Sequence, residues 1–259
     1  MTSRIRVTKM HGARNDFVVF DRRRQDAGDL EGIARRICDR RAGIGADGFI
    51  VIERSSNASV AMRTFNPDGS EAEICGNGLR CAAQWLDEAG EGARIALHTA
   101  AGMVNTEIIT REPSYRVRVE MPAPRIVARE LAGLGDSFLV DTGNPHLVLF
   151  RSSLDAENLE TLGRTLQDDA RFPAGVNVHV AVAESGNRLR VRHWERGAGA
   201  TQACGTGAVA SAVAAIDAGR VSAPVEVLVP GGTLTVEFGN GKVALVGPSE
   251  RVFDTEIAV

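Results

Sequence analysis

The sequence has almost no lysine, no long apolar run and no block of like charge. Of its 259 residues 30 are Lys or Arg, yet only Lys9 and Lys242 are lysines. No apolar stretch approaches the roughly 18–20 residues needed to cross a bilayer, so no membrane association is expected. The net charge of −3 is spread along the chain. This pattern argues against a nucleic-acid-binding protein, because phosphate contacts need a clustered basic surface.

The scarcity of lysine also bears on cofactor chemistry. Enzymes that use pyridoxal phosphate hold it as a Schiff base on a lysine. Lys9 lies in an alternating, strand-like pattern and Lys242 in the turn-like segment 239–242, and neither position is typical of a buried cofactor lysine. We therefore predict that the protein uses no pyridoxal phosphate and no other cofactor.

The composition is that of an ordinary globular protein, with 44% apolar and 24% charged residues. A chain of this length buries enough surface to fold without disulfide or metal. The first residues mix charged with apolar side chains, so we expect no secretory signal and a cytoplasmic location with reduced cysteines. Because the four cysteines form no CxxC pair and have no close histidine spacing, no metal site is expected.

The chain contains an internal repeat. Cys75-Gly-Asn-Gly recurs as Cys204-Gly-Thr-Gly, 129 residues later, and the same shift relates Asn15 to Asn144. It also aligns segment 62–65 with segment 191–194. Several matches at one spacing indicate duplication. We predict two homologous lobes, residues 1–121 carrying Cys75 and residues 122–259 carrying Cys204.

Each lobe is predicted to mix helices and strands, which makes the fold α+β. Amphipathic spacing predicts helices over 30–41 and 154–169, and Ala-rich stretches predict helices over 79–88 and 208–218. Strands are expected at 4–7, 17–20, 49–52, 115–119, 138–140, 147–150, 189–192 and 234–238. No linker is long, so we expect the lobes to pack directly and to leave a cleft that holds the active site.

In each lobe a cysteine precedes a glycine-rich turn and the start of a helix. A helix N-terminus carries unpaired N–H groups and partial positive charge. It lowers the pKa of a nearby thiol and binds anions, and glycine lets a carboxylate approach closely. If pseudo-twofold symmetry makes the two helix starts face each other, a carboxylate is held between two thiols.

This arrangement suits removal of an α-hydrogen from an amino acid without a cofactor. Preorganised donors stabilise the developing charge, one thiolate removes the proton and the opposing thiol returns one to the other face. The predicted chemistry is two-base racemisation or epimerisation. Cys38 and Cys81 have no counterpart in the repeat and are expected to fill the core. A disulfide between Cys75 and Cys204 would be an inactivating oxidation.

At these residues the sequence resembles the diaminopimelate epimerase family, whose members work without pyridoxal phosphate. The resemblance spans almost the whole chain through KMHGARNDFVVFD, GIGADGF, FNPDGSEAEICGNGLRCAAQWL, TGNPH, AGVNV, WERGAGATQACGTGA and VPGG. It implies two lobes, each a mostly antiparallel sheet wrapped around a central helix, and a homodimer. It also implies conversion of LL-2,6-diaminopimelate to the meso isomer, for lysine and peptidoglycan precursor synthesis.

The resemblance assigns roles to individual residues. Cys75 and Cys204 are the implied acid/base pair, and His146 and Glu195 are implied to tune the cysteine pKa values, Glu195 also contacting substrate. The implied substrate-binding residues are Asn15, Asn66, Gly76, Asn77, Asn144, Asn177, Arg196, Gly205 and Thr206. Arg196 suits a distal carboxylate, since its planar fork makes bidentate contacts. His11, His98, His179 and His193 are interpreted as structural.

Four positions depart from the family pattern. Arg14 stands where a glycine is common, Gly48 where some members have Gln, and Ala200 where Glu is frequent, while His179-Val180 replaces the end of a usual Asn-Val-x-Phe. None removes a catalytic group, but Arg14 and Gly48 bear on substrate specificity.

Two alternatives remain at this point. The first is a cofactor-independent racemase of another amino acid, such as histidine, on the same fold. The second is a non-catalytic amino-acid-binding module, which has no need of both cysteines. Asn66, Asn177 and Arg196 together suit a second amino-acid head group better than an imidazole, which favours diaminopimelate.

Overall fold

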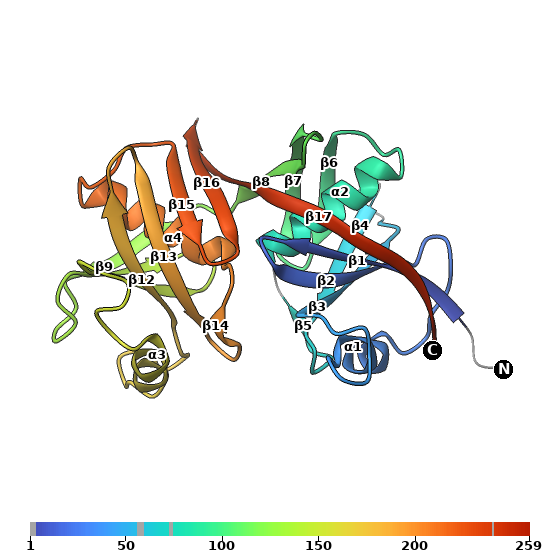
Figure 1. Cartoon of the computed structure of the whole chain (residues 1–259), viewed down its shortest axis with the longest axis horizontal. Helices are drawn as coiled ribbons and strands as arrows, with labels where there is room; N and C mark the ends of the chain where they lie inside the picture. The colour runs from blue at the N-terminus through green and yellow to red at the C-terminus, as the bar shows by residue number, and fades with distance from the viewer. Residues whose placement is uncertain (1–3, 56–59, 73–74, 240) are drawn as a thin grey trace. The chain divides into compact units, whose positions relative to one another are not determined.

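A computed structural model describes residues 4–55, 60–72, 75–239 and 241–259 (Figure 1). The chain forms two compact units, which we describe one at a time. Unit 1 is Met1–Val119 with Gly247–Val259, and unit 2 is Glu120–Val246. We predicted a single division at residue 121, whereas in the structure the last segment of the chain, Gly247–Val259, also belongs to unit 1. That segment belongs to unit 1 because it pairs with the first strand, from Arg4 opposite Ala258 to His11 opposite Glu250.

Unit 1 consists of strands around one helix, with a second helix outside. Its elements are β1 (Arg4–Gly12), β2 (Asn15–Asp21), α1 (Leu30–Cys38), β3 (Gly48–Glu53), β4 (Val60–Phe65), β5 (Glu71–Ala72), α2 (Gly76–Glu88), β6 (Arg94–Thr99), β7 (Gly102–Thr110) and most of β8 (Tyr115–Met121). The later part of β17 (Lys242–Ala258) completes it.

Unit 2 repeats this order. Its elements are β9 (Arg125–Arg129), β10 (Ser137–Asp141), β11 (Pro145–Phe150), α3 (Leu159–Gln167), β12 (Asn177–Glu184), β13 (Arg188–Glu195), β14 (Gly199–Thr201), α4 (Gly205–Asp217), β15 (Val225–Val229), β16 (Gly232–Gly239) and the start of β17. The eight predicted strands all lie within observed strands. Asn240, in the predicted turn before Lys242, lies outside the described residues.

The order of paired strands in unit 1 is repeated in unit 2 as β9–β10–β11–β12–β13–β15–β16–β17. In unit 1 the order is β17–β1–β2–β3–β4–β6–β7–β8, and β8 in turn pairs with β17, so the series closes. Among the pairs whose register is described, β2–β3 and β4–β6 are parallel. Unit 2 has the matching parallel pairs β11–β12 and β13–β15. The sheets are therefore mostly antiparallel, as predicted.

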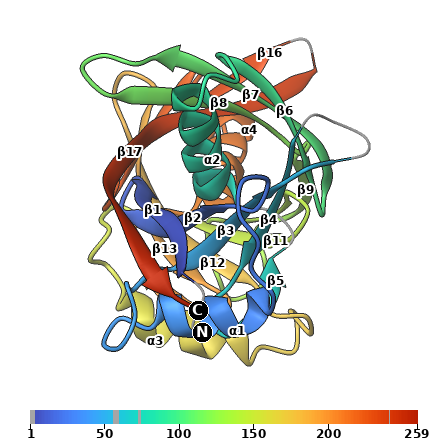
Figure 2. The same ribbon diagram turned by 90° about the vertical axis from the view of Figure 1, so that its right-hand side faces the viewer.

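The 129-residue repeat is visible in the helices. Adding 129 to the bounds of α1 and α2 gives the bounds of α3 and α4. The 13-residue helices α2 and α4 are the central ones. In unit 1, α2 contacts β1, β2, β3 and β7, and Figure 2 shows it surrounded by strands. In unit 2, α4 contacts β10–β13, β15 and β16. The predicted two-lobe α+β fold is thus confirmed.

Helix boundaries differ from the predicted ones for local reasons. Helix α1 ends at Cys38 rather than at residue 41 because the following Asp39 has extended backbone. Helix α3 begins at Leu159 rather than at residue 154 because Asn158 caps it, accepting a hydrogen bond from the Thr161 amide. Helices α2 and α4 begin three residues earlier than predicted, directly after Cys75 and Cys204.

The core of each unit packs the outer helix against the sheet. In unit 1 the apolar face of α1 lies against Phe20, Phe49 and Phe65. In unit 2 the equivalent cluster joins α3 to Trp194 and neighbouring aliphatic side chains. Among the described residues, no helix is both long and apolar enough to span a membrane.

Candidate active site

Both repeated cysteines are helix N-caps. Cys75 and Cys204 have extended backbone, with φ of −135° and −120°, and the next residue begins α2 or α4. In each case the sulfur accepts a hydrogen bond from the amide three residues on, Gly78 or Gly207, at 3.4 Å. Each thiol therefore lies at the positive end of a helix, where negative charge is stabilised.

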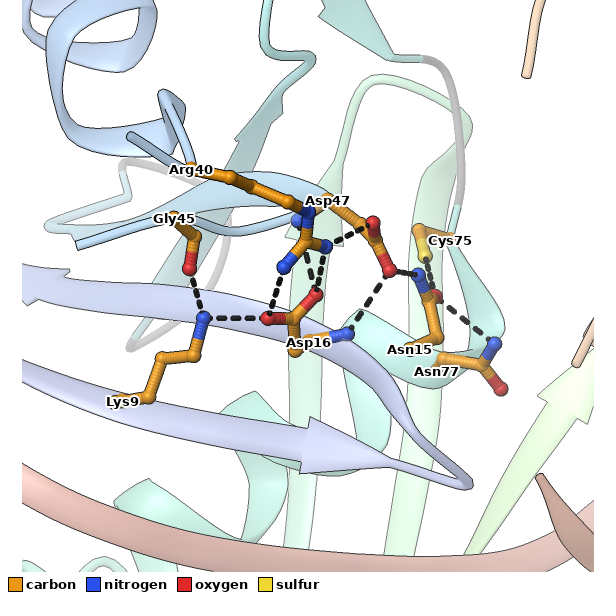
Figure 3. A network of polar contacts seen from close by, with 8 residues as sticks. All are labelled: Lys9, Asn15, Asp16, Arg40, Gly45, Asp47, Cys75 and Asn77. Atoms are coloured by element: carbon orange, nitrogen blue, oxygen red, sulfur yellow. Dashed lines mark hydrogen bonds and ion pairs between the residues drawn. The ribbon is translucent and has the colours of Figure 1, made fainter. Parts of the chain in front are cut away.

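In unit 1 two asparagines lie beside the Cys75 thiol (Figure 3). Asn15, at the start of β2, accepts hydrogen bonds at Oδ1 from Asn77 Nδ2 (3.0 Å) and from Cys75 Sγ (3.9 Å). Its Nδ2 donates to Asp47 Oδ2 at 2.7 Å. Three of the predicted site residues are thus brought together, and Asp47 fixes the orientation of the Asn15 amide.

An ion-pair network lies behind this cluster (Figure 3). Arg40 binds both Asp16 and Asp47, at 2.7 and 2.6 Å, and Lys9 Nζ lies 2.5 Å from Asp16. Burial raises the pKa of Asp16, but the hydrogen bonds from Arg40 and Lys9 outweigh it and hold the pKa at about 2. Lys9 is only 8% exposed and also donates to the Gly45 carbonyl. Lys9 is therefore buried, and its ion pair with Asp16 offsets the cost of burying the ammonium group.

Arg80 is a further charged residue near Cys75 that the sequence patterns do not reveal. It is fully buried in α2, where Nη2 donates to Asn77 Oδ1 at 2.6 Å and Nε donates to the Pro248 carbonyl at 3.0 Å. Burial lowers its pKa to about 10, so the guanidinium stays charged at neutral pH. It holds Asn77 in place and adds positive charge beneath the Cys75 cap.

In unit 2 the Cys204 thiol lies beside Glu195 and Thr206. Cys204 is 4% exposed, and its sulfur is 3.5 Å from Thr206 Oγ1. Burial raises the thiol pKa well above its usual value, and the Glu195 carboxylate, which accepts a hydrogen bond from the thiol, raises it further. Glu195 is itself held by Thr201 Oγ1, which donates to Oε1 at 2.5 Å. Cys204 is therefore protonated at neutral pH.

The other predicted residues of unit 2 form two pairs. Asn144 Oδ1 lies 2.7 Å from His146 Nε2. Asn177 accepts a hydrogen bond at Oδ1 from the Arg196 amide (3.0 Å) and donates from Nδ2 to the Pro145 carbonyl (3.2 Å). His146 and Asn177 are paired across β11 and β12, so the two pairs are neighbours. The exposed Arg196 side chain lies against Gly175.

Asn66 lies in a turn after β4, where it hydrogen-bonds to Ser70 through side chain (3.0 Å) and backbone (2.8 Å). Arg14 is exposed at the tip of the β1–β2 hairpin with φ of 63°, a left-handed conformation that favours glycine. Gly48 is packed so closely that an added Cβ would lie 3.1 Å from the Phe65 carbonyl oxygen. Side chains larger than glycine at position 48 therefore need the neighbours to move.

Cys38 and Cys81 lie where core residues were expected. Both are buried, and burial raises the pKa of each thiol to about 12. They therefore remain thiols at neutral pH, and their interpretation as core-filling residues is confirmed. Among the described residues, no three His, Cys, Asp or Glu side chains are grouped to hold a metal ion.

Known proteins match the chain over nearly its full length. The family model for diaminopimelate epimerase matches residues 7–127 and 138–251. A diaminopimelate epimerase from Desulforudis audaxviator is 42% identical, covering 95% of this chain and 97% of the relative. One from Sphingopyxis alaskensis is also 42% identical, covering 97% and 96%.

Solved structures share the fold at low sequence identity. A PhzF-family phenazine biosynthesis protein from Bacillus anthracis has a TM-score of 0.79 at 17% identity, covering 99% of this chain and all of the other. A hydroxyproline epimerase from Agrobacterium vitis has a TM-score of 0.72 at 17% identity, covering 100% and 94%. The capped cysteines, the repeated architecture and the full-length matches together show that the chain belongs to the diaminopimelate epimerase family.

Proposed function

We propose that this protein converts LL-2,6-diaminopimelate to meso-diaminopimelate without pyridoxal phosphate, using Cys75 and Cys204 as its acid/base pair. The observation that carries the proposal is that a cysteine caps the N-terminus of a 13-residue helix in both copies of the repeat. A cysteine at an N-cap is unusual, because Ser, Thr, Asp and Asn are the preferred caps. Its occurrence in both copies supports a chemical role.

The two helix N-termini would bind the carboxylate next to the reacting carbon. Gly76-Asn77 and Gly205-Thr206 are the first residues of α2 and α4, where the helix dipole places partial positive charge that favours an anion. As the α-proton leaves, negative charge spreads into the carboxylate. Donors already fixed in place stabilise that charge without reorganising during the reaction.

The proton transfers follow from the environments of the two thiols. Cys204 is held as a thiol by burial and by Glu195, so we assign it the role of proton donor in the first turnover. In that turnover Cys75 acts as the thiolate and removes the α-proton from one face, while Cys204 donates its proton to the opposite face of the same carbon. Cys75 is then the thiol and Cys204 the thiolate, which is the state that the reverse reaction needs.

The remaining polar residues would select the substrate. Arg196 would bind the distal carboxylate, and Asn66 and Asn177 the distal ammonium and its neighbours. Asn15, which lies beside Cys75, and Asn144, which lies beside His146, would contact the reacting head group. A substrate with two amino-acid head groups needs such donors at both ends.

Two further assignments complete the proposal. We infer that the protein acts in the cytoplasm, in amino-acid biosynthesis for lysine and peptidoglycan precursors, and that it forms a homodimer. Light scattering of the purified protein measures the oligomeric state, and a monomer mass would reject the dimer.

The reaction is tested by incubating the purified protein with LL-diaminopimelate in D₂O under reducing conditions, without added cofactor. Deuterium entering the α-position with inversion is the expected result, and absence of exchange rejects the assignment. Cys75→Ala and Cys204→Ala should each abolish inversion. Cys81→Ala is the matched control, because Cys81 lies in α2 but away from its cap, and it should retain activity.

A further inference from the structure

Three buried histidines in unit 2 form a continuous hydrogen-bonded row behind Asn144. His146 Nε2 lies 2.7 Å from Asn144 Oδ1, His146 Nδ1 lies 2.8 Å from His179 Nε2, and His179 Nδ1 lies 2.8 Å from His193 Nδ1. All three rings are at most 1% exposed. We call His146, His179 and His193 the histidine row.

The rings contact each other through their nitrogens, at 2.8 Å in both pairs. Ring centroids are 5.0 Å apart in both pairs, with an interplanar angle of 26° for His146 and His179 and of 75° for His179 and His193. The residues come from the adjacent strands β11, β12 and β13, and His179 is directly opposite His193. The strand register therefore builds the row, and α4 covers it.

With Asn144 Oδ1 taken as the acceptor, the hydrogen bonds assign a proton to one nitrogen of each ring. Asn144 Oδ1 is also 3.3 Å from Thr142 Oγ1, and as an acceptor it needs the proton on His146 Nε2. Neutral His146 then accepts at Nδ1 from His179 Nε2–H, and His179 accepts at Nδ1 from His193 Nδ1–H. Every N–H in the row therefore points toward Asn144.

The far end of the row agrees with this direction. His193 Nε2 is buried, and among the described residues it has no hydrogen-bond partner. In the assigned direction this nitrogen is an unpaired acceptor. In the reverse direction it would be an unpaired buried N–H, and orphaned buried donors are the rarer case in proteins. Burial lowers the pKa of His146 and His193 to about 3 and that of His179 well below its usual value, so the three rings are neutral.

The fold does not need histidine at these places. The equivalent positions in unit 1 hold Phe17, Ile50 and Thr64, and Ile50 is opposite Thr64 just as His179 is opposite His193. Unit 1 thus builds the same strands without a polar row. Burying polar groups is costly unless they are hydrogen-bonded, so apolar packing alone does not account for three imidazoles here.

The row is in contact with the Cys204 cap as well as with Asn144. A Cβ added at Gly207 would lie 2.3 Å from Cε1 of His179, so the ring lies directly against the first turn of α4. Gly207 is the residue whose amide donates to the Cys204 sulfur. Among the described residues, Asn144 Nδ2 makes no hydrogen bond, which leaves it available to a ligand.

We propose that His179 and His193 are positioning residues that hold His146 as its Nε2–H tautomer and thereby aim the Asn144 Nδ2 donor at the substrate. The assignment of Asn144 to the substrate rests on the proposed function, but the tautomers of the row do not. If the row were reversed, the Asn144 amide would turn over and present an oxygen to an anionic carboxylate. The row therefore decides whether this position attracts or repels the substrate.

Nitrogen-15 NMR of the histidine side chains tests the row directly in the full-length wild-type protein at pH 7. The expected tautomers are Nε2–H for His146 and His179 and Nδ1–H for His193. His146 as Nδ1–H, or a protonated row, would overturn the proposal. This measurement needs no substrate. If the tautomers are those expected but the protein has no epimerase activity, the proposed function is rejected and the assignment of the histidine row stands.

A pair of variants then connects the row to the substrate. His179→Ile copies the residue of unit 1 and removes the donor to His146 Nδ1, whereas His179→Gln keeps an N–H there. For His179→Ile we expect a mixture of His146 tautomers. We also expect the KM for LL-diaminopimelate to rise about fivefold to tenfold, which corresponds to the loss of one hydrogen bond. His179→Gln should restore both towards wild type.

The pattern of the kinetic constants separates positioning from a general loss of structure. Partial unfolding lowers the active fraction and so reduces kcat with KM unchanged, whereas a misdirected Asn144 raises KM. Val180→Ala is the control, because Val180 is buried next to His179 and faces the opposite core. It should leave the His146 resonances and KM unchanged. An unchanged KM in His179→Ile, with activity intact, would overturn the proposal.

Discussion

Mild acid should destabilise unit 2 more than a domain whose histidines have ordinary pKa values, because the three histidines of the row are neutral in the folded unit. Their folded pKa values are lowered, so below pH 6.5 the unfolded chain binds protons that the folded unit does not. The stability that these groups contribute is present above the unfolded pKa of about 6.5. It is lost as the pH falls toward the folded value of about 3 for His146 and His193.

The magnitude follows from linkage. A histidine whose pKa is about 6.5 unfolded and about 3 folded loses roughly 2 kcal/mol of stabilisation between pH 7 and pH 5. His146 and His193 together lose about 4 kcal/mol, an upper limit that is a large part of the stability of many domains. The pKa of His179 is also lowered by burial, so its protonation adds to this loss. Replacing one of them should reduce the pH sensitivity by roughly 2 kcal/mol.

The two tryptophans allow unit 2 to be observed separately. Trp85 lies in α2 of unit 1 and Trp194 in β13 of unit 2, so in a Trp85→Phe background the fluorescence reports unit 2. Urea unfolding at pH 7, 6 and 5 gives the free energy of unfolding at each pH. His193→Thr, which copies Thr64 of unit 1, is compared with the parent.

The parent should lose about 2 kcal/mol more than His193→Thr between pH 7 and pH 5. His98→Gln serves as a control, since His98 is only half-buried and lies in unit 1, and its profile should follow the parent. Parallel profiles for the parent and His193→Thr would refute the reasoning, because they would mean that the pKa of His193 is the same in the folded and the unfolded protein.

Three other features are tested by substitution. Arg14→Gly should raise the free energy of unfolding by about 0.5–1 kcal/mol in urea titrations, because Arg14 has a left-handed backbone and the equivalent residue of unit 2 is Gly143. A lower free energy of unfolding would mean that the Arg14 backbone is not strained. Glu195→Gln should shift alkylation of Cys204 to lower pH, followed by mass spectrometry, because the carboxylate raises the thiol pKa; an unchanged profile would contradict the contact. Gly207→Ala should cost more than about 2 kcal/mol in thermal melts, since its Cβ would lie 2.3 Å from His179, whereas Gly78→Ala meets neighbours at 3.2 Å and should cost less.

The parts of the site that could be predicted depend on short stretches of sequence. Cys75 and Cys204 stand directly before glycine-rich helix starts, so their capping position follows from neighbouring residues alone. The repeat made the prediction stronger, because one spacing of 129 residues relates both caps and both outer helices. The starts of α2 and α4 were predicted three residues too late, since a cysteine is not among the usual capping residues.

The supporting residues could not be predicted, because distant segments bring them together. Lys9, Asp16 and Arg40 meet only after β1, β2 and the loop following α1 are in place. His179 and His193 are opposite each other only in one strand register, and a shift of one residue would turn them to the other face. The available signal was that Ile50 and Thr64 of the first copy are replaced by histidines in the second.

The membership of Gly247–Val259 in unit 1 has a consequence for synthesis of the protein on the ribosome. Unit 2 is one continuous stretch of chain, so it can fold as soon as it emerges. Strand β1, although among the first residues to appear, has no partner on one side until β17 has been translated. Unit 1 therefore cannot complete its sheet before the later half of the chain has been made, and the edge of β1 that pairs with β17 stays open during that interval.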